Sequence, residues 1–178
     1  RLYPGGKALA GYFMLREFVP GTDALSPDSV LVVANGLLTG APVSTAARFT
    51  VAARSPLTGA YGESEAGGYF GPELKAAGYE AIIVTGRAAA PVYLSIRDAN
   101  VEIRDAGGLW GREPEEVQTA IRAELGDSYV RVLQIGPGGE NLVRYAALTN
   151  ELAHFNGRTG MGAVMGSKNL KAIAVRGK

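Results

Sequence analysis

Glycine is unusually frequent in this chain and gathers in three segments. The sequence holds 25 glycines among 178 residues, about twice the usual share of ~7%. The dense segments are residues 59–71, 136–139 and 157–166. Because glycine has no Cβ, it adopts positive φ and lets a ligand or another stretch of backbone come close. Apolar residues make up 47% of the chain, a globular share, so these segments are expected within a folded domain.

Two interpretations of the glycine segments stay open on this evidence. Successive backbone N–H groups in such turns form concave sites that bind phosphate, or the segments are simply tight turns. Three of them in one domain, two of which are flanked by arginine and polar side chains, favour binding. No nucleotide fingerprint is present. Gly160, Gly162 and Gly166 precede a strand instead of following one, and Ser167 and Lys168 stand in the wrong order for a P-loop.

The composition excludes several classes of function. Eighteen Lys and Arg balance 17 Asp and Glu, so no broad field attracts nucleic acid or an anionic membrane. The absence of cysteine excludes disulfides, a thiolate nucleophile and an iron–sulfur cluster ligated by these residues. A single histidine excludes a zinc site with several histidines. No stretch approaches the ~20 apolar residues of a membrane span, so we expect neither nucleic acid nor membrane as a partner.

Length and sequence pattern indicate one domain, residues 1–178, of a longer protein. A chain of 178 residues is of ordinary single-domain size, and no internal linker divides it. The chain opens in mid-pattern at Arg1 and without a methionine. We therefore interpret it as a fragment with sequence missing at both ends.

Three segments have helical patterns, namely Lys7–Phe18, Pro72–Ala77 and Glu113–Leu125. The third is the clearest, because Pro114 and acidic residues stand in its first turn and Gly126 follows its end. Long loops are expected over residues 55–68 and 156–166, and a turn over 136–139. Strands or strand-sized apolar segments are expected at Val30–Ala34, Arg48–Arg54, Glu80–Thr85, Val92–Ile96, Val101–Arg104, Tyr129–Ile135, Val143–Leu148 and Lys171–Val175. About seven strands and three or four helices in irregular order predict an α+β fold with largely antiparallel or mixed sheets.

A few charged side chains near the glycine segments are candidates for binding. Arg48 and Arg158 stand beside small residues, where a guanidinium reaches an anion; the simpler alternative is a solvated charge. His154 precedes the last glycine segment and is more typical of a structural hydrogen bond than of catalysis. Glu63 and Glu65 would point the same way in an extended chain, and either serve a divalent cation or face water.

Taken together, four segments resemble one family. They are Ala53–Gly59 (ARSPLTG), Glu65–Lys75 (EAGGYFGPELK), Ile135–Leu142 (IGPGGENL) and Gly157–Ile173 (GRTGMGAVMGSKNLKAI). These motifs resemble the N-terminal domain of the aldehyde ferredoxin oxidoreductases, which are tungsten enzymes with a bis-pterin cofactor. The resemblance covers essentially the whole chain, and its last motif is long and specific.

The resemblance implies a pseudo-duplicated α+β domain that forms a base for two tungstopterin molecules. In that family, pterin dithiolene sulfurs hold the tungsten, and a magnesium ion bridges the two pterin phosphates. A 4Fe-4S cluster is ligated by later, helical domains, which also carry the acid and base residues, so no catalytic residue is expected in this fragment. The absence of cysteine agrees with a cluster that is ligated outside this fragment.

Carried over by motif position, Arg48 would lie between pterin and cluster, and Gly67 would give its amide to a pterin phosphate. Glu65 and Phe155 would supply backbone carbonyls to magnesium. Gly157 and Arg158 would contact the pterin or its phosphate. The full set of implied cofactor-binding residues is Arg48, Glu65, Ala66, Gly67, Gly68, His154, Phe155, Asn156, Gly157 and Arg158.

This sequence departs from the family pattern at four positions. His154 stands in place of an arginine, and Lys7 replaces the arginine of the opening motif. Phe155 and Asn156 replace small residues. These departures bear on the subfamily, and so on the substrate and on tungsten versus molybdenum.

The resemblance implies that the parent protein oxidises an aldehyde to a carboxylic acid. Electrons would pass through the 4Fe-4S cluster to ferredoxin or another carrier. The parent would be a cytoplasmic homodimer in which this domain contacts its own C-terminal domains, and the fragment alone would be inactive. Two alternatives stay open: a non-catalytic α+β scaffold, or a phosphate- or nucleotide-binding module that kept the fold.

Overall fold

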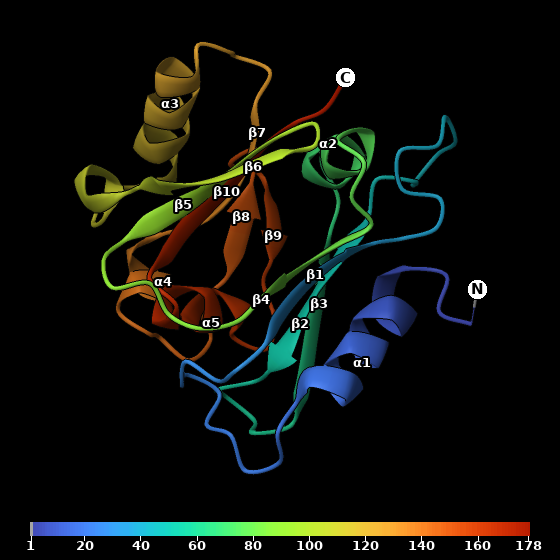
Figure 1. Cartoon of the computed structure of the whole chain (residues 1–178), viewed down its shortest axis with the longest axis vertical. Helices are drawn as coiled ribbons and strands as arrows, with labels where there is room; N and C mark the ends of the chain where they lie inside the picture. The colour runs from blue at the N-terminus through green and yellow to red at the C-terminus, as the bar shows by residue number, and fades with distance from the viewer. Residues whose placement is uncertain (1) are drawn as a thin grey trace.

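Two β-sheets make up the centre of the computed structural model, which describes residues 2–178 (Figure 1). The smaller sheet has the order β3-β2-β1-β4, and all its strands are antiparallel. Its strands are β1 (Leu31–Asn35), β2 (Phe49–Arg54), β3 (Tyr61–Ala66) and β4 (Ala81–Val84). The larger sheet has the order β6-β5-β10-β7-β8-β9 and is mixed, because β5 runs parallel to β10. Its strands are β5 (Val92–Arg97), β6 (Asn100–Asp105), β7 (Arg131–Ile135), β8 (Leu148–Asn150), β9 (His154–Asn156) and β10 (Leu170–Arg176).

The helices are placed in the same way in the two halves of the chain. α1 (Gly6–Glu17) precedes β1, and α3 (Pro114–Leu125) precedes β7. α2 (Phe70–Ala76) follows β3, and α5 (Met161–Ser167) follows β9. The remaining helical segments are the single turns η1 (Gly107–Leu109) and α4 (Pro137–Glu140).

These positions reveal an internal repeat. In each half, three consecutive strands form a meander, a short helix follows, and a fourth strand returns to pair with the first. The first half is β1-β2-β3-α2-β4 and the second is β7-β8-β9-α5-β10. The β5–β6 hairpin extends only the second sheet, beside β10. The expected pseudo-duplicated α+β fold with mostly antiparallel sheets is therefore confirmed.

The predicted helices and most predicted strands occur within a few residues of their expected bounds. The ends of α3 follow from its sequence. Glu113 and Glu116 form a reciprocal capping box, Pro114 occupies the first turn, and Gly126 ends the helix at φ 65°.

Two predicted loops were wrong. Residues 55–68 contain β3, in which Gly62, Ser64 and Ala66 are buried and alternate with outward-facing residues. This period-2 burial is the pattern of a strand, although its glycines and glutamates have low strand propensity. Residues 156–166 include the end of β9 and most of α5, where burial overrides the poor helix propensity of glycine. The turn expected at 136–139 closes into α4, and the apolar segment 143–148 becomes strand only from Leu148.

Helix α5 is buried along its whole length, and its glycines account for this. A Cβ added to Gly166 would lie 2.0 Å from the carbonyl oxygen of Gly139. One added to Gly162 would lie 2.4 Å from the carbonyl oxygen of Ala147. Gly139, Gly162 and Gly166 are therefore needed for close backbone packing, a role that differs from both the phosphate-binding and the tight-turn interpretations.

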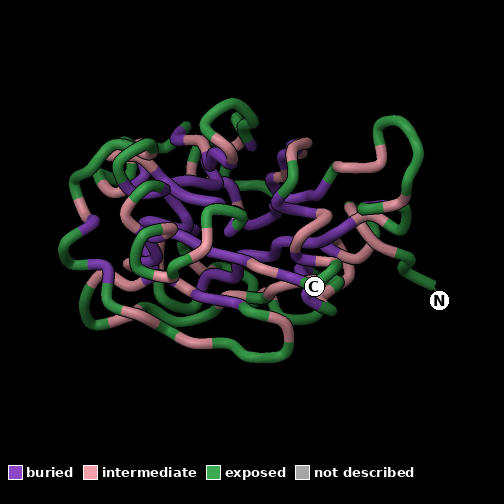
Figure 2. Tube along the Cα trace, turned by 90° about the horizontal axis from the view of Figure 1, so that it is seen from above, coloured by how far each residue is buried: buried purple, intermediate pink, exposed green. Residues whose placement is uncertain are grey.

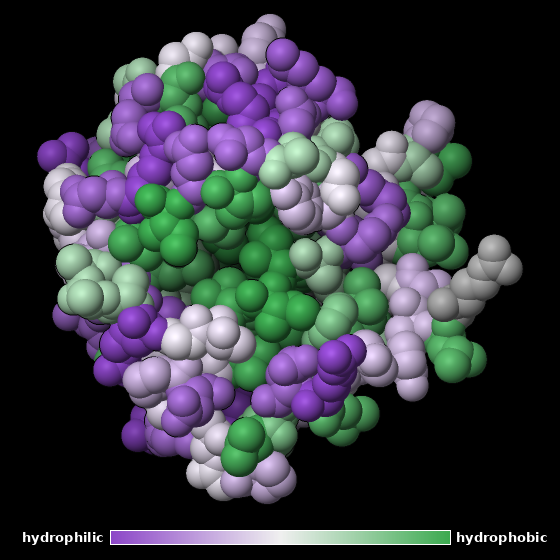
Figure 3. All heavy atoms as spheres, in the orientation of Figure 1, coloured by the Kyte–Doolittle hydropathy of each residue, from purple (hydrophilic) through white to green (hydrophobic). Residues whose placement is uncertain are grey.

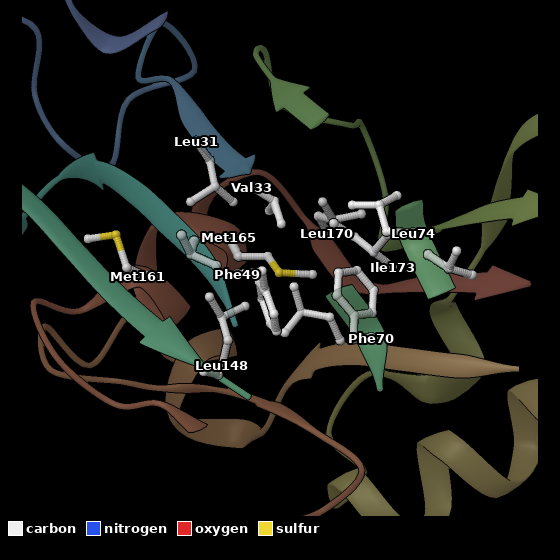
Figure 4. Packing of buried hydrophobic residues seen from close by; sticks show 14 of the residues in the cluster. Leu31, Val33, Phe49, Phe70, Leu74, Leu148, Met161, Met165, Leu170 and Ile173 are labelled. Atoms are coloured by element: carbon white, nitrogen blue, oxygen red, sulfur yellow. The ribbon is translucent and has the colours of Figure 1, made fainter. Parts of the chain in front are cut away.

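The main core lies between the two sheets. Phe49 of the smaller sheet, Ile173 of the larger sheet and Met165 of α5 belong to one buried cluster (Figure 4). Phe70 brings α2 into the same cluster, with its ring 5.2 Å from that of Phe49. The buried part of the chain runs through the middle of the molecule and exposed segments surround it (Figure 2).

Two lysines are buried in polar surroundings. The Lys171 ammonium is fully buried, contacts the Glu140 carboxylate and donates to the carbonyl of Arg112 at 3.0 Å. The ammonium of Lys168 donates to the carbonyls of Pro27, Ser29 and Gly86, and burial lowers the pKa of Lys168 to about 8. These contacts attach α4 to β10 and the end of α5 to the loops beside the smaller sheet.

An apolar hollow opens on one face between β4 and the β5–β6 hairpin. Apolar residues gather in the centre of this face (Figure 3). The hollow has a volume of about 570 Å³, and its rim includes the exposed side chains of Ile83, Val101 and Ile103. No helix within residues 2–178 is long and apolar enough to cross a membrane.

Gly166→Ala is expected to destabilise the fold. The added methyl group would overlap the backbone of α4, and overpacking of this kind costs about 1–3 kcal/mol or more of unfolding free energy. Gly138→Ala is the matched control, since its Cβ would meet only the Ala146 side chain at 4.0 Å. Denaturant unfolding of both variants measures the difference, and equal stability would contradict the packing role of Gly166.

Candidate functional site

A polar groove lies where the two sheets meet. Its volume is about 550 Å³, and both β3 and β9 contribute to it. Residues from the start of α1, from the segment before β2 and from the chain after β9 complete its walls. The lining residues are Lys7, Arg48, Glu63, Ser64, Glu65, Phe155, Gly157 and Arg158. The groove therefore brings together Arg48, Glu65, Phe155, Gly157 and Arg158 from the implied cofactor-binding set.

The internal repeat gives the groove two related halves. In the first repeat, residues 67–69 connect β3 to α2. In the second, residues 157–160 make the equivalent connection from β9 to α5. Because β3 and β9 pack against each other, the two equivalent connections lie in neighbouring parts of the molecule. Such a site suits a ligand, or a pair of ligands, with two similar halves.

Side chains, not a shared backbone ladder, join β3 to β9. Both are the outermost strands of their sheets. Asn156 donates from Nδ2 to the carbonyl of Ser64 at 2.8 Å, and Thr159 donates from Oγ1 to the carbonyl of Glu63 at 3.2 Å. The backbone amide of Arg158 donates to Oγ of Ser64 at 3.3 Å. We call these contacts, together with that of Asn150 to Gly67 below, the β3–β9 joint.

The connection after β3 is supported from the second repeat. Asn150 donates from Nδ2 to the carbonyls of Gly67 at 3.3 Å and His154 at 3.4 Å. Glu151 accepts a hydrogen bond from the backbone amide of Tyr69 at 2.6 Å. Gly68 has a φ of +91°, and a Cβ there would lie 2.3 Å from Oδ1 of Asn150. At Gly67, an added Cβ would meet no atom within 4 Å, so its backbone faces open space.

Charges of both signs line the groove. Lys7 forms an ion pair with Glu63 at 2.7 Å and lies 3.9 Å from Glu65, and its hydrogen bond to Glu63 raises the pKa of Lys7. Arg48 lies 4.0 Å from the other oxygen of Glu65, while 65% of its side chain is exposed. Tyr61 donates a hydrogen bond to the Glu63 carboxylate at 3.1 Å. Partial burial is the main cause that raises the pKa of Tyr61 to about 12, and the negative charge of Glu63 adds to it.

The two glutamates share one face of β3, as the sequence predicted, with Lys7 beside both. Within residues 2–178, no three His, Cys, Asp or Glu side chains gather in a way that could hold a metal ion. Side chains alone therefore do not build a metal centre here, and any divalent cation would need backbone carbonyls or ligand oxygens.

The remaining candidate residues take different positions. Ala66 is buried at the end of β3, and the Asn156 side chain is fully buried in the joint. His154 and Phe155 are exposed on β9. Sequence reasoning missed Asn150, Ser64 and Thr159 as site-building residues. A polar Asn150 at the end of an apolar segment was the one available signal, because a buried amide needs a partner.

Gly68→Ala is expected to destabilise the protein, whereas Gly67→Ala is not. The first change combines a positive φ with a clash against Asn150, and strained backbone of this kind costs about 1–3 kcal/mol. The second meets open space, so a change within about 0.5 kcal/mol is expected. Chemical unfolding of the pair measures the contrast, and a stable Gly68→Ala protein would contradict the support by Asn150.

Comparisons with known proteins place the chain in a family. The sequence matches the family "Aldehyde ferredoxin oxidoreductase, N-terminal domain" over residues 1–177. It is 51% identical to a "Tungsten-containing aldehyde ferredoxin oxidoreductase" of Pyrococcus furiosus, over 97% of this chain and 29% of that protein. It is also 36% identical to an "Aliphatic sulfonate oxidoreductase, WOR-like subunit" of the same organism, over 97% of this chain and 30% of the relative.

A solved structure agrees with the sequence relatives. The chain superimposes with a TM-score of 0.97 and 40% identity on a chain of the "Active site complex BamBC of Benzoyl Coenzyme A reductase in complex with 1,5 Dienoyl-CoA". The match covers 99% of this chain and 27% of that chain. The chain thus spans less than a third of the length of these relatives. It belongs to the aldehyde ferredoxin oxidoreductase family and corresponds to the N-terminal domain of that family.

Proposed function

We propose that this domain binds a tungsten bis-pterin cofactor in the groove between β3 and β9. The observation that carries the proposal is the position of the groove at the meeting of two repeats, each of which supplies one equivalent connection. A cofactor with two similar pterin halves matches this arrangement. The names of the tungsten-containing relatives support the choice of metal, with molybdenum as the alternative.

The residues present fit such a group. At Gly67 an added Cβ would meet nothing within 4 Å, and at Gly157 only the Phe155 side chain at 3.9 Å, so ligand atoms have room to approach both segments of backbone. Lys7, Arg48 and Arg158 supply positive charge at the lining of the groove. Open backbone amides combined with guanidinium groups are the donors that phosphate oxygens require.

Each residue has a binding role in this proposal. Arg48 would lie between pterin and cluster, Arg158 would donate to the pterin or its phosphate, and the amide of Gly67 would donate to a pterin phosphate. The backbone carbonyls of Glu65 and Phe155 would hold a magnesium ion, which would supply positive charge next to the phosphates. Gly157 lines the groove beside these groups, and Ala66, Gly68, His154 and Asn156 stand next to the lining residues in the chain and support them. When bound, the cofactor supplies the two-electron redox chemistry, and the protein supplies positioning and charge.

The parent protein, in our proposal, oxidises an aldehyde to a carboxylic acid in the cytoplasm. Residues 1–178 would form a single cofactor-binding domain, with a 4Fe-4S cluster ligated by later domains and electrons leaving to ferredoxin or another carrier. The apolar hollow between β4 and the β5–β6 hairpin supports packing against further domains, because exposed apolar side chains such as Val101 and Ile103 gather at its rim. A homodimer is part of the same proposal.

Two of the relatives favour other substrate classes for the whole protein, one class each. One is named for a sulfonate and another comes from a coenzyme A thioester reductase. Both alternatives keep the domain's cofactor role and change only the substrate or the direction of electron flow. Activity assays with aldehydes, sulfonates and aromatic acyl thioesters on the whole protein separate them.

Elemental analysis of the full-length protein, purified without oxygen from its native host, tests the cofactor. We expect about one tungsten and about four irons per chain, the iron in a single 4Fe-4S cluster. Molybdenum in place of tungsten would leave the proposed mechanism unchanged and would assign the protein to a different subfamily. Folded protein with neither metal would contradict the proposal and favour a scaffold that kept only the fold.

Arg48→Ala and Arg158→Ala are expected to lower the tungsten content of the full-length protein about tenfold. Each loses a charge-assisted hydrogen bond to the cofactor, and tenfold corresponds to about 1.4 kcal/mol. Because Arg48 is exposed and its ion pair is long, the unfolding free energy should change by less than about 1 kcal/mol. Exposed Arg112, which does not line the groove, provides the control Arg112→Ala. Wild-type tungsten content in both groove variants would contradict the assigned roles.

A further inference from the structure

The β3–β9 joint holds together the two strands whose ends carry the proposed cofactor contacts. Residues 63–68 come from the first repeat and residues 154–158 from the second. The two sheets share no backbone ladder at this point, because each ends at its own outermost strand. The width of the groove therefore depends on side chains that reach from one repeat to the other.

Asn156 makes the shortest contact in the joint. Its side chain is fully buried, and Nδ2 lies 2.8 Å from the carbonyl oxygen of Ser64. That carbonyl belongs to an outermost strand, so the amide takes the place of a donor from a neighbouring strand. Ser64 is flanked by Glu63 and Glu65, which both line the groove, and Asn156 is followed directly by Gly157 and Arg158. The hydrogen bond from Asn156 to Ser64 is therefore a direct link between the two walls of the groove.

Asn150 makes a similar contact to the first repeat, at the carbonyl of Gly67 instead of that of Ser64. Its Nδ2 donates to the carbonyl of Gly67, the residue whose amide we assign to a phosphate, and to the carbonyl of His154. The side chain is fully buried, and its Oδ1 lies against Gly68. The two asparagines therefore hold carbonyls on both sides of Glu65 and Ala66.

We propose that Asn156 and Asn150 are positioning residues that set the separation of the two cofactor-bearing walls. The inference rests on the cofactor role proposed above and assigns it two residues that act through the backbone of Ser64 and Gly67. Without the Asn156 amide, the buried carbonyl of Ser64 has lost its donor, and an unpaired buried carbonyl is costly. The β3 wall of the groove therefore shifts until water reaches this carbonyl. The walls then no longer match both halves of the ligand at once.

The test compares two buried amides in the full-length, tungsten-loaded protein. Asn156→Leu removes the donor while keeping the number and branching of the side chain's heavy atoms. Gln134→Met is the matched control, because Gln134 is also fully buried and donates from Nε2 to the carbonyl of Pro114 at 2.9 Å. Like Asn156, it has a side-chain oxygen with no partner among residues 2–178, and it does not line the groove. Both variants should therefore lose similar unfolding free energy.

The readouts are unfolding temperature and the rate at which tungsten leaves the protein during dialysis below that temperature. We expect Asn156→Leu to release tungsten about tenfold faster than Gln134→Met at matched stability, which corresponds to a barrier to release lower by about 1.4 kcal/mol. Equal release from the two variants, or release that follows stability alone, would overturn the positioning role. A wild-type protein without tungsten or molybdenum would overturn the cofactor proposal itself, and the positioning role with it.

Discussion

The burial of α5 is the constraint on which the rest of the structure depends. This helix lies in the core with side chains such as Val164 and Met165 among residues of both sheets, while its glycines face backbone carbonyls of neighbouring segments. Any larger residue at Gly162 or Gly166 would force the neighbouring backbone to move. The close approach keeps the two repeats on one core, so the outermost strands β3 and β9 meet at its edge.

The candidate site follows from that meeting. A backbone ladder would have merged the sheets and closed the space between β3 and β9. Instead, Asn150, Asn156 and Thr159 reach across the repeats, and the groove remains open beside them. The charges around it are placed by three different parts of the chain, namely the start of α1, the segment before β2 and the chain that follows β9.

Local sequence predicted much of the fold. α3 was predicted closely because its proline, its acidic first turn and its terminal glycine each act within one helical turn. β3 and α5 were missed because their glycines lower local propensity, while their stability comes from contacts far away in the chain. Among the site residues, Arg48 and Arg158 were found through their small neighbours and the family resemblance. Asn150 and Thr159 were not, because their partners lie more than 80 residues away.

The sequence by itself determined the family, the absence of thiolate chemistry in this domain and the ends of α3. Those properties depend on residue type and on short motifs, which do not require knowledge of distant contacts. Only the tertiary structure decided which glycines pack and which leave space. Gly166 and Gly67 are the same residue type, but one faces a carbonyl oxygen and the other faces open space. That difference arises from the packing of the two repeats, which no local pattern encodes.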